Sequence, residues 1–182
     1  MEKREIAALV EKARKGIAQY LEIMQLFPSV NVAEDRDFQR KFNTFYRIQR
    51  RPQIWYETYY SFFQQAKEHK PTFNSVLDHL QRSLNRCEPS FSSKLIATLD
   101  PGQPVWDKFV LEFTKIKRPQ YSSRNKHEEA KTAYAHLQQW YQSFMKSADG
   151  QLIICTFNEM VPERDQIASL KKVDFVLWQM RA

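Results

Sequence analysis

The sequence predicts an all-α protein with about eight helices around a single core. Apolar residues recur at spacings of three and four through most of the 182 residues, which is the periodicity of amphipathic helices. Prolines divide this pattern into segments of helix length. Apolar residues make up 42% of the chain, with 13 Phe, 8 Tyr and 4 Trp, and this is enough to fill a sizeable core. We expect one helical domain over residues 1–182.

The clearest predicted helix covers residues 4–26, within an N-terminal unit of residues 1–27. Its apolar positions follow the helical repeat without interruption; they are Ile6, Leu9, Val10, Ala13, Ile17, Tyr20, Leu21 and Met24. Phe27 and Pro28 end the helix, and residues 28–35 are expected to form a loop. Asp35 could cap the helix that follows.

A basic aromatic helix is predicted over residues 36–51, at the start of a central unit of residues 36–113. Phe38, Phe42 and Phe45 share one face. Cations gather elsewhere on the helix, and we select as candidate phosphate contacts Arg40, Lys41, Arg47, Arg50 and Arg51. A basic stripe with interleaved aromatics suits nucleic-acid binding. The alternative is a solvated charged face above a row of core phenylalanines.

Two further helices should follow, one at residues 53–69 and one from Phe73 to Leu84. The expected buried face of the first consists of Trp55, Tyr59, Phe62, Phe63 and Ala66. Tyr56 and Tyr60 fall off that face, where they could stack on bases or lie at the margin of the core.

Residues 88–113 predict two helices around a tight turn at Asp100–Pro104. Ser90 or Ser92 could cap the first helix, which carries Lys94. Pro104 fits the first turn of the second helix, whose apolar face would contain Val105, Phe109 and Phe113. Asp107 would then lie in the first turn, where the helix dipole favours a carboxylate. On position alone, Asp107 is a helix-start acid and Lys94 an exposed lysine.

The last third predicts a basic loop at residues 114–127 and helices at residues 128–147, 151–161 and 164–180. Asp149 and Gly150 are expected to interrupt the helical structure between the first two of these helices. Residues 151–157 are β-branched enough for a lone strand, but their helical spacing favours a helix. Asp174 could carry function, or it could cap or pair locally.

Composition restricts the classes of function. The net charge of +7 favours polyanionic partners. No signal peptide and no apolar run of membrane length is present, and Cys87 and Cys155 lie far apart, so we expect free thiols, a cytoplasmic location and no membrane partner. Three glycines leave no phosphate-cradling loop, and the four histidines lack ligand spacing, so neither a cofactor nor a metal ion is expected.

The stretch at residues 88–113 resembles part of the helix-hairpin-helix base-excision DNA glycosylases. In that family a hairpin precedes a helix with an early lysine, and a later Val-Asp-Thr-His-Val-like segment carries the catalytic aspartate. Here Ser-Phe-Ser-Ser-Lys94-Leu-Ile-Ala resembles the hairpin end and lysine helix, and Pro-Val-Trp-Asp107-Lys-Phe-Val resembles the aspartate segment. The stretch also resembles an uncharacterised group of helical bacterial proteins with a Ser-Lys-Leu…Pro…Pro-Ile-Trp-Asp pattern.

The resemblance implies a glycosylase-like helical arrangement and release of a damaged or mispaired base from double-stranded DNA. Asp107 would stabilise developing positive charge on the sugar or orient a water, and Lys94 would act as an amine nucleophile if the enzyme also cleaves the strand. Ser92 and Ser93, at the hairpin end, would contact the DNA backbone. The alternative is a non-enzymatic helical module that binds a protein or a nucleic acid. The absence of the family's hairpin glycines favours that alternative.

Overall fold

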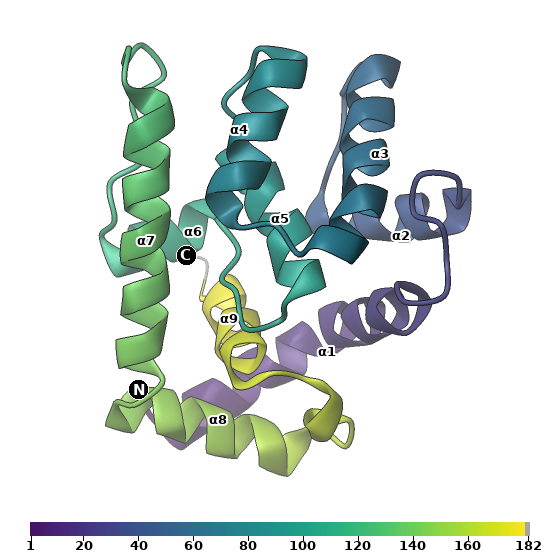
Figure 1. Ribbon diagram of the computed structural model, residues 1–182. Helices are drawn as coiled ribbons and strands as arrows, with labels where there is room; N and C mark the ends of the chain where they lie inside the picture. Colours follow the sequence, from purple (N-terminus) through teal and green to yellow (C-terminus); the bar gives the residue numbers. More distant parts are fainter. Residues whose placement is uncertain (181–182) are drawn as a thin grey trace.

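The computed structural model describes residues 1–180, and this range is all-α, which confirms the predicted fold class (Figure 1). It contains nine α-helices, one short 3-10 turn and no strand. The helices are α1 (Lys3–Leu26), α2 (Arg36–Tyr46), α3 (Gln53–His69), α4 (Phe73–Leu84), α5 (Pro89–Leu99), α6 (Lys108–Thr114), α7 (Lys126–Phe144), α8 (Ala148–Met160) and α9 (Ser169–Gln179). The 3-10 turn is Arg164–Gln166.

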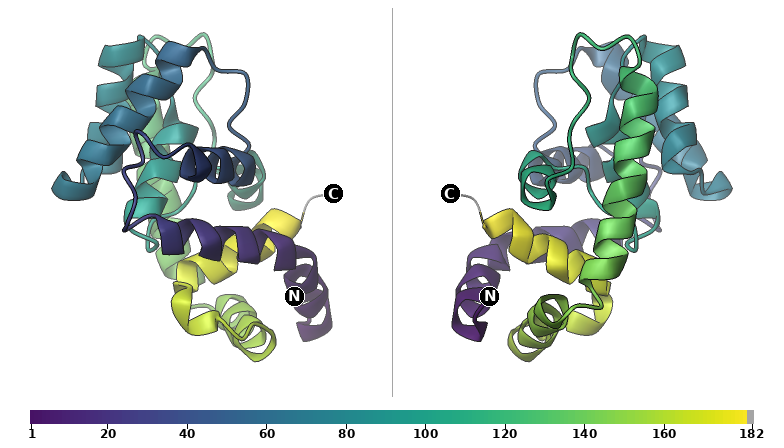
Figure 2. Two further views of the ribbon diagram at one scale, coloured as in Figure 1. Left: turned by 90° about the vertical axis from the view of Figure 1, so that its right-hand side faces the viewer. Right: turned by 90° about the vertical axis from the view of Figure 1, so that its left-hand side faces the viewer.

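The helices form two groups that meet at α9. Helices α1, α8 and α9 pack on one another, and α2 crosses α1. Helices α3, α4, α5 and α7 stand together on the other side, as Figure 1 and both views of Figure 2 show. One continuous apolar cluster runs through both groups, and it draws residues from α1 through α9. The central helix α9 has eight consecutive buried residues, Leu170–Leu177, and five of them belong to this cluster: Leu170, Val173, Phe175, Val176 and Leu177.

Helix α2 ends five residues earlier than its amphipathic pattern predicts. Asp35 caps its start as expected, because Asp35 Oδ1 accepts a hydrogen bond from Phe38 N at 2.7 Å. Arg47 then takes a positive φ of 53°, and Ile48 N donates to Asn43 O, which is the hydrogen bond of a Schellman motif. Ile48 is buried directly after this turn. The chain therefore leaves the helix to bury Ile48, and Arg50 and Arg51 lie outside it.

Tyr56 and Tyr60, which lie off the predicted face of α3, are both at least partly buried in the protein. Tyr60 is 1% exposed, and its hydroxyl donates to Asn43 Oδ1 at 2.8 Å, so it is a core residue. Tyr56 is half-buried, as is Phe62, which was predicted to face the core. Phe62 instead stacks on the ring of His79 in α4 at a centroid distance of 3.8 Å.

The helix after the Asp100–Pro104 turn begins later than predicted. Pro104, Val105 and Trp106 are buried in an extended segment, and Asp107 is the cap of α6. The inward residues of α6 are therefore Val110 and Leu111, while Phe113 is 41% exposed. In α5 the first helical residue is Pro89, with Glu88 at the cap position, so neither Ser90 nor Ser92 caps that helix.

Asp149 and Gly150 begin a helix instead of breaking one. They lie in the first turn of α8, and Ser147 Oγ accepts a hydrogen bond from Gly150 N at 3.2 Å. A Cβ at position 150 would lie 2.0 Å from Phe144 O, so glycine is required by the close passage of the backbone. The preference for helix at residues 151–157 is confirmed. The predicted helix at 164–180 is divided into the 3-10 turn and α9, and Met180 is exposed at 37%.

The two helical glycines should respond oppositely to alanine. Gly150→Ala forces a methyl group onto Phe144 O and should destabilise the protein by about 1 to 3 kcal/mol. Gly16→Ala in α1 meets its nearest neighbour, Phe175 Cε1, at an ordinary 3.8 Å, so the gain in helix propensity should stabilise by about 0.5 to 1 kcal/mol. Urea denaturation of both variants measures this. Equal stability of the two variants would contradict the close passage at Gly150.

Candidate active site

A buried serine positions the two residues that the sequence selects as catalytic. Ser93 in α5 accepts a hydrogen bond on Oγ from Trp106 N at 2.8 Å and donates to Ser90 O at 2.9 Å. The first of these bonds ties the extended segment before α6 to the first half of α5. Lys94 follows Ser93, and Asp107 follows Trp106. The two candidate residues are therefore brought to the same place by a bond between their direct neighbours.

Lys94 and Asp107 line one cavity of about 190 Å³. Its other lining residues are mostly aromatic or apolar, with one cation; they are Phe45, Tyr46, Arg47, Val105 and Trp178. This volume is below the range typical of pockets for drug-sized ligands, about 300 to 1,000 Å³. The cavity is thus suited to a single ring or sugar, held between aromatic walls.

The amine of Lys94 has an environment that favours its neutral form. Burial lowers the pKa of Lys94 to about 8; the charge of Asp107 opposes this shift and that of Arg51 adds to it. Lys94 Nζ lies 4.8 Å from the ring centre of Phe91 and 6.0 Å from that of Tyr46. Within residues 1–180 no carboxylate lies within ion-pair distance of this amine. An amine with this pKa is substantially uncharged near pH 8 and can act as a nucleophile.

Asp107 has a structural role as well as a place in the cavity. Its Oδ1 accepts a hydrogen bond from Phe109 N at 2.8 Å, so the side chain caps α6, as the helix-start interpretation expects. Asp107 is half-buried and also lines the cavity beside Lys94. The capping bond fixes its carboxylate in the cavity wall.

The aromatic wall of the cavity rests on a buried ion pair in α9 that the sequence analysis did not identify. Lys171 Nζ donates to Asp174 Oδ2 at 2.7 Å, and Tyr141 of α7 donates to Asp174 Oδ1 at 2.9 Å. Lys171 is 2% exposed and Asp174 is fully buried. Burial raises the pKa of Asp174, and the ammonium of Lys171 opposes that rise. Asp174 thus pairs locally, one of the two roles considered for it.

Five rings surround the ammonium of Lys171. Its nearest ring is Trp178, whose centroid lies 4.4 Å from Nζ. The other four lie between 5.3 and 5.8 Å away, and they belong to Tyr20, Phe45, Tyr46 and Phe175. Three of the five rings, those of Phe45, Tyr46 and Trp178, also line the cavity. A Lys three residues before an Asp, among the apolar residues of a predicted helix, was the signal available in the sequence.

The predicted basic face is divided by ion pairs. Lys41 contacts Glu22 at 2.8 Å, and both Lys41 and Arg40 pair with Asp37. Arg51 contacts Glu88 at 3.5 Å.

The other three candidate cations, Arg47, Arg50 and Arg51, are placed differently. Arg51 stacks over the ring of Phe91 with Cζ 4.7 Å from its centre. Arg47 and Arg50 are exposed, and both have positive φ. Arg47 also lines the cavity with Lys94 and Asp107.

Ser92 and Ser93 do not offer a surface to a phosphate, which corrects their selection as nucleic-acid contacts. Both are 0% exposed. Ser92 Oγ donates to Glu88 O at 3.0 Å, and Ser93 bonds as described above. The reason is that α5 is central, and the face that carries these serines lies against other parts of the chain.

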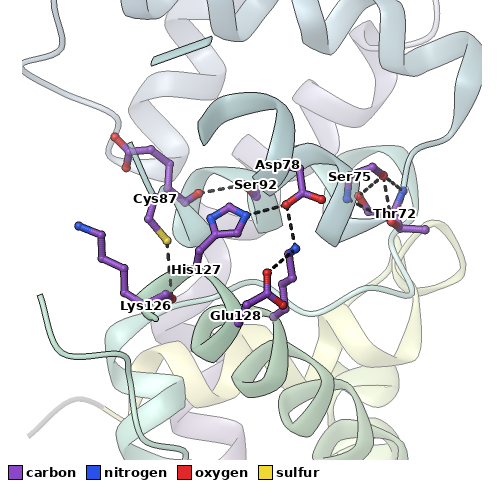
Figure 3. Close-up of polar contacts among 10 residues, drawn as sticks. Thr72, Ser75, Asp78, Cys87, Ser92, Lys126, His127 and Glu128 are labelled. Atoms are coloured by element: carbon purple, nitrogen blue, oxygen red, sulfur yellow. Dashed lines mark hydrogen bonds and ion pairs between the residues drawn. The ribbon is translucent and has the colours of Figure 1, made fainter. Parts of the chain in front are cut away.

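A second polar cluster joins α4 to α7 (Figure 3). None of its residues lines the Lys94–Asp107 cavity. His127 Nε2 lies 2.6 Å from Asp78 Oδ1, and Lys131 Nζ contacts Asp78 at 2.9 Å and Glu128 at 2.8 Å. Hydrogen bonds from Lys131 and His127 lower the pKa of Asp78. Within the described chain, no group of three or more His, Cys, Asp or Glu side chains is arranged to hold a metal ion. We interpret the cluster as a structural contact that holds α4 against α7.

Comparison with known proteins adds no relative to these observations. No protein-family model matches the chain, and neither a curated protein nor a solved structure matches it. Among the described helices, none has the length and apolar character needed to cross a membrane.

The buried pair in α9 should be strongly coupled. Lys171→Met or Asp174→Asn leaves one buried charge without its partner, so each should cost about 3 to 5 kcal/mol of stability. The double variant should recover most of this loss, because Asn can still accept from Tyr141 and no charge remains buried. Chemical denaturation of the four proteins measures the coupling. Lys3→Gln, which breaks the exposed Lys3–Glu159 pair, is the control and should change stability little. Additive losses in the double variant would contradict a direct pair.

Proposed function

We propose that the protein binds double-stranded DNA and acts on a nucleotide in the Lys94–Asp107 cavity, as a DNA glycosylase with lyase activity. The observation that carries this proposal is the meeting of Lys94 and Asp107 in an aromatic-walled cavity, with the pKa of Lys94 lowered to about 8. Perturbed titratable groups in a cavity are typical of catalytic sites. The same two residues lie in the two short segments that resemble the helix-hairpin-helix DNA glycosylases.

The chemistry requires an amine, an acid and room for a sugar. Neutral Lys94 would attack C1′ of the deoxyribose, forming a carbon–nitrogen bond while the bond to the base breaks and its electrons leave with the base. Asp107 would stabilise the positive charge that develops on the sugar. Loss of the amine proton and opening of the sugar would give an imine between Lys94 and C1′, from which the 3′ phosphate can be eliminated. The flanking rings of Tyr46 and Trp178 would exclude water and stack on the displaced nucleotide.

DNA binding in this proposal rests on a smaller set of cations than the sequence suggests. The net charge is +7, which favours association with a polyanion. Arg40 and Lys41 form ion pairs with Asp37, whereas Arg47 and Arg50 are exposed, and Arg47 lines the cavity. Arg47 and Arg50 are therefore the phosphate contacts that we retain.

A non-enzymatic helical module is the second candidate function. The observation that favours it is the capping bond of Asp107, since a helix cap alone accounts for a carboxylate at this position. In that case Lys94 and Asp107 would have structural roles, and any nucleic-acid or protein binding would involve other surfaces. The variants below separate the two candidates.

Covalent trapping tests the nucleophile directly. Incubation with a duplex that contains an abasic site and borohydride should yield a protein–DNA adduct, and Lys94→Gln should abolish it because the amine is lost. The trapping rate should rise with pH through an inflection near 8, where Lys94 loses its proton. Asp107→Asn should lower single-turnover base release from a lesion panel by about 100-fold or more. A full adduct yield from Lys94→Gln would end the proposal.

Stability measurements test the environment assigned to Lys94 and distinguish a loss of activity from unfolding. The folded pKa of Lys94 is lower than its unfolded value of 10.5, so between about pH 8 and 10.5 the unfolded state binds more protons and stability rises with pH. The variant Lys94→Met removes the buried ammonium and should be more stable than the parent at pH 7 by about 1 to 3 kcal/mol. The difference should shrink as the pH approaches 10.5. A parent that loses stability steadily from pH 8 to 10 would contradict the assigned environment of Lys94.

The salt dependence of DNA binding tests the retained cations. Substitution of both Arg47 and Arg50 by Gln should reduce the slope of log affinity against log salt by about 1.8, or 0.9 for each lost phosphate contact. The matched control changes two exposed cations of α1, Lys12 and Lys15, to Gln and should leave the slope nearly unchanged. Fluorescence anisotropy with a labelled duplex measures both. An equal decrease in the control would mean that only net charge matters.

A further inference from the structure

A second and larger cavity lies where α4 ends and α5 and α7 begin. Its volume is about 440 Å³, within the range of pockets for small organic ligands. It shares no lining residue with the Lys94–Asp107 cavity. The residues that matter for its chemistry are Arg86, Arg118, Lys126, Tyr121, Trp106 and Cys87. We call it the basic cavity.

Three cations from different segments converge on the basic cavity. Arg86 is held from one side by Glu88 at 3.0 Å, and Arg118 has a carboxylate of Glu112 only at 3.8 Å. Lys126 makes no ion pair within residues 1–180, and its Nζ instead lies 5.1 Å from the ring centre of Tyr121. No acidic residue lines the cavity. The basic cavity therefore has a positive balance of charge that its own walls do not neutralise.

The backbone adds to this positive character. The first residue of α5, Pro89, and the first residue of α7, Lys126, both line the cavity, so two helix N-termini meet there. Helix α7 is 19 residues long, and Asn125 at its cap position makes no side-chain hydrogen bond to the first turn. The N-terminus of a long helix favours negative charge, and the first turn of α7 already carries Glu128 and Glu129. Neither of these carboxylates lines the cavity: Glu128 pairs with Lys131 and Glu129 accepts a hydrogen bond from Ser123. Figure 3 shows Lys126 beside Cys87 at this end of α7.

An aromatic residue stands beside the cations. Tyr121 is 94% exposed although it lines the cavity, and among the described residues it is the most exposed large apolar side chain. Trp106 contributes a second, buried aromatic residue, which its backbone bond to Ser93 holds in position. An exposed ring next to cations is suited to stack on a planar base while the cations contact a phosphate.

We propose that the basic cavity binds a nucleoside phosphate. Arg118, Lys126 and the N-terminus of α7 hold the phosphate, and Tyr121 stacks on the base. The ligand is either a free nucleotide or the 5′-phosphorylated end of a nucleic-acid strand, since both present the same phosphate beside a planar ring. The proposal does not depend on the glycosylase chemistry of the other cavity.

Cysteine alkylation provides a local readout of occupancy. Cys87 lines the basic cavity and is half-buried, while Cys155 on α8 is exposed; both are free thiols. Burial raises the pKa of Cys87, so its alkylation is slow enough to follow at pH 8. A ligand that fills the cavity should slow alkylation of Cys87 and leave Cys155 unchanged. Cys155 thus serves as the internal control in every sample.

The experiment measures alkylation of the whole protein by iodoacetamide, with mass spectrometry at each cysteine. The probes are adenosine monophosphate, adenosine, inorganic phosphate, and a short single-stranded oligonucleotide with or without a 5′ phosphate. At about ten times its dissociation constant, adenosine monophosphate or the phosphorylated oligonucleotide should slow Cys87 about tenfold. Adenosine, phosphate and the unphosphorylated strand should bind about tenfold or more weakly, because each lacks one part of the ligand. Protection by the oligonucleotide alone would assign the site to strand ends, and protection by the mononucleotide would assign it to free nucleotides.

Variants test whether protection of Cys87 from alkylation depends on Arg118, Tyr121 and Lys126. Lys126→Gln, Arg118→Gln and Tyr121→Ala should each weaken binding about tenfold. Lys117→Gln removes the same charge from the same loop without lining the cavity, and it should change binding less than about twofold. The proposal is overturned if none of the five probes protects Cys87, or if Lys117→Gln weakens binding as much as Lys126→Gln.

Discussion

The buried pair of Lys171 and Asp174 is the constraint on which the rest of the structure depends. Removal of both charges from water is costly, and the pair is tolerated only because every charge has a close partner. Asp174 accepts from Lys171 and from Tyr141 of α7, and five rings from α1, α2 and α9 surround the ammonium. The requirement to enclose this pair places α2 and α7 against α9, and it joins the two groups of helices.

The same rings connect this pair to the candidate active site. Phe45, Tyr46 and Trp178 face Lys171 on one side and line the Lys94 cavity on the other. The two lysines share an aromatic environment but differ in their partners. Lys171 has a carboxylate at 2.7 Å, whereas Lys94 has only the more distant charges of Asp107 and Glu88, and burial lowers its pKa. One lysine is therefore held in a buried ion pair, and the other has an amine with a lowered pKa.

The extended segment at residues 104–107 separates the two cavities. Successive side chains of an extended chain point to opposite sides. Val105 and Asp107 line the Lys94 cavity, and Trp106 between them lines the basic cavity. The bond from Trp106 N to Ser93 Oγ fixes this arrangement against α5. Ser93, chosen from the sequence as a DNA contact, is instead the residue that aligns both sites.

The sequence by itself determined the all-α class, most helix positions and the two residues that share the candidate active site. Periodic apolar spacing is a local property of the chain, so it was sufficient for helices such as α1, α3 and α4. Only the tertiary structure decided that α2 ends at Tyr46, that Gly150 begins a helix, and that Ser92 and Ser93 are buried. Each of these depends on a contact with a distant segment or on the burial of one residue beyond a helix end. The same holds for Lys171 and Asp174, because their enclosure by rings from three helices has no pattern along the chain.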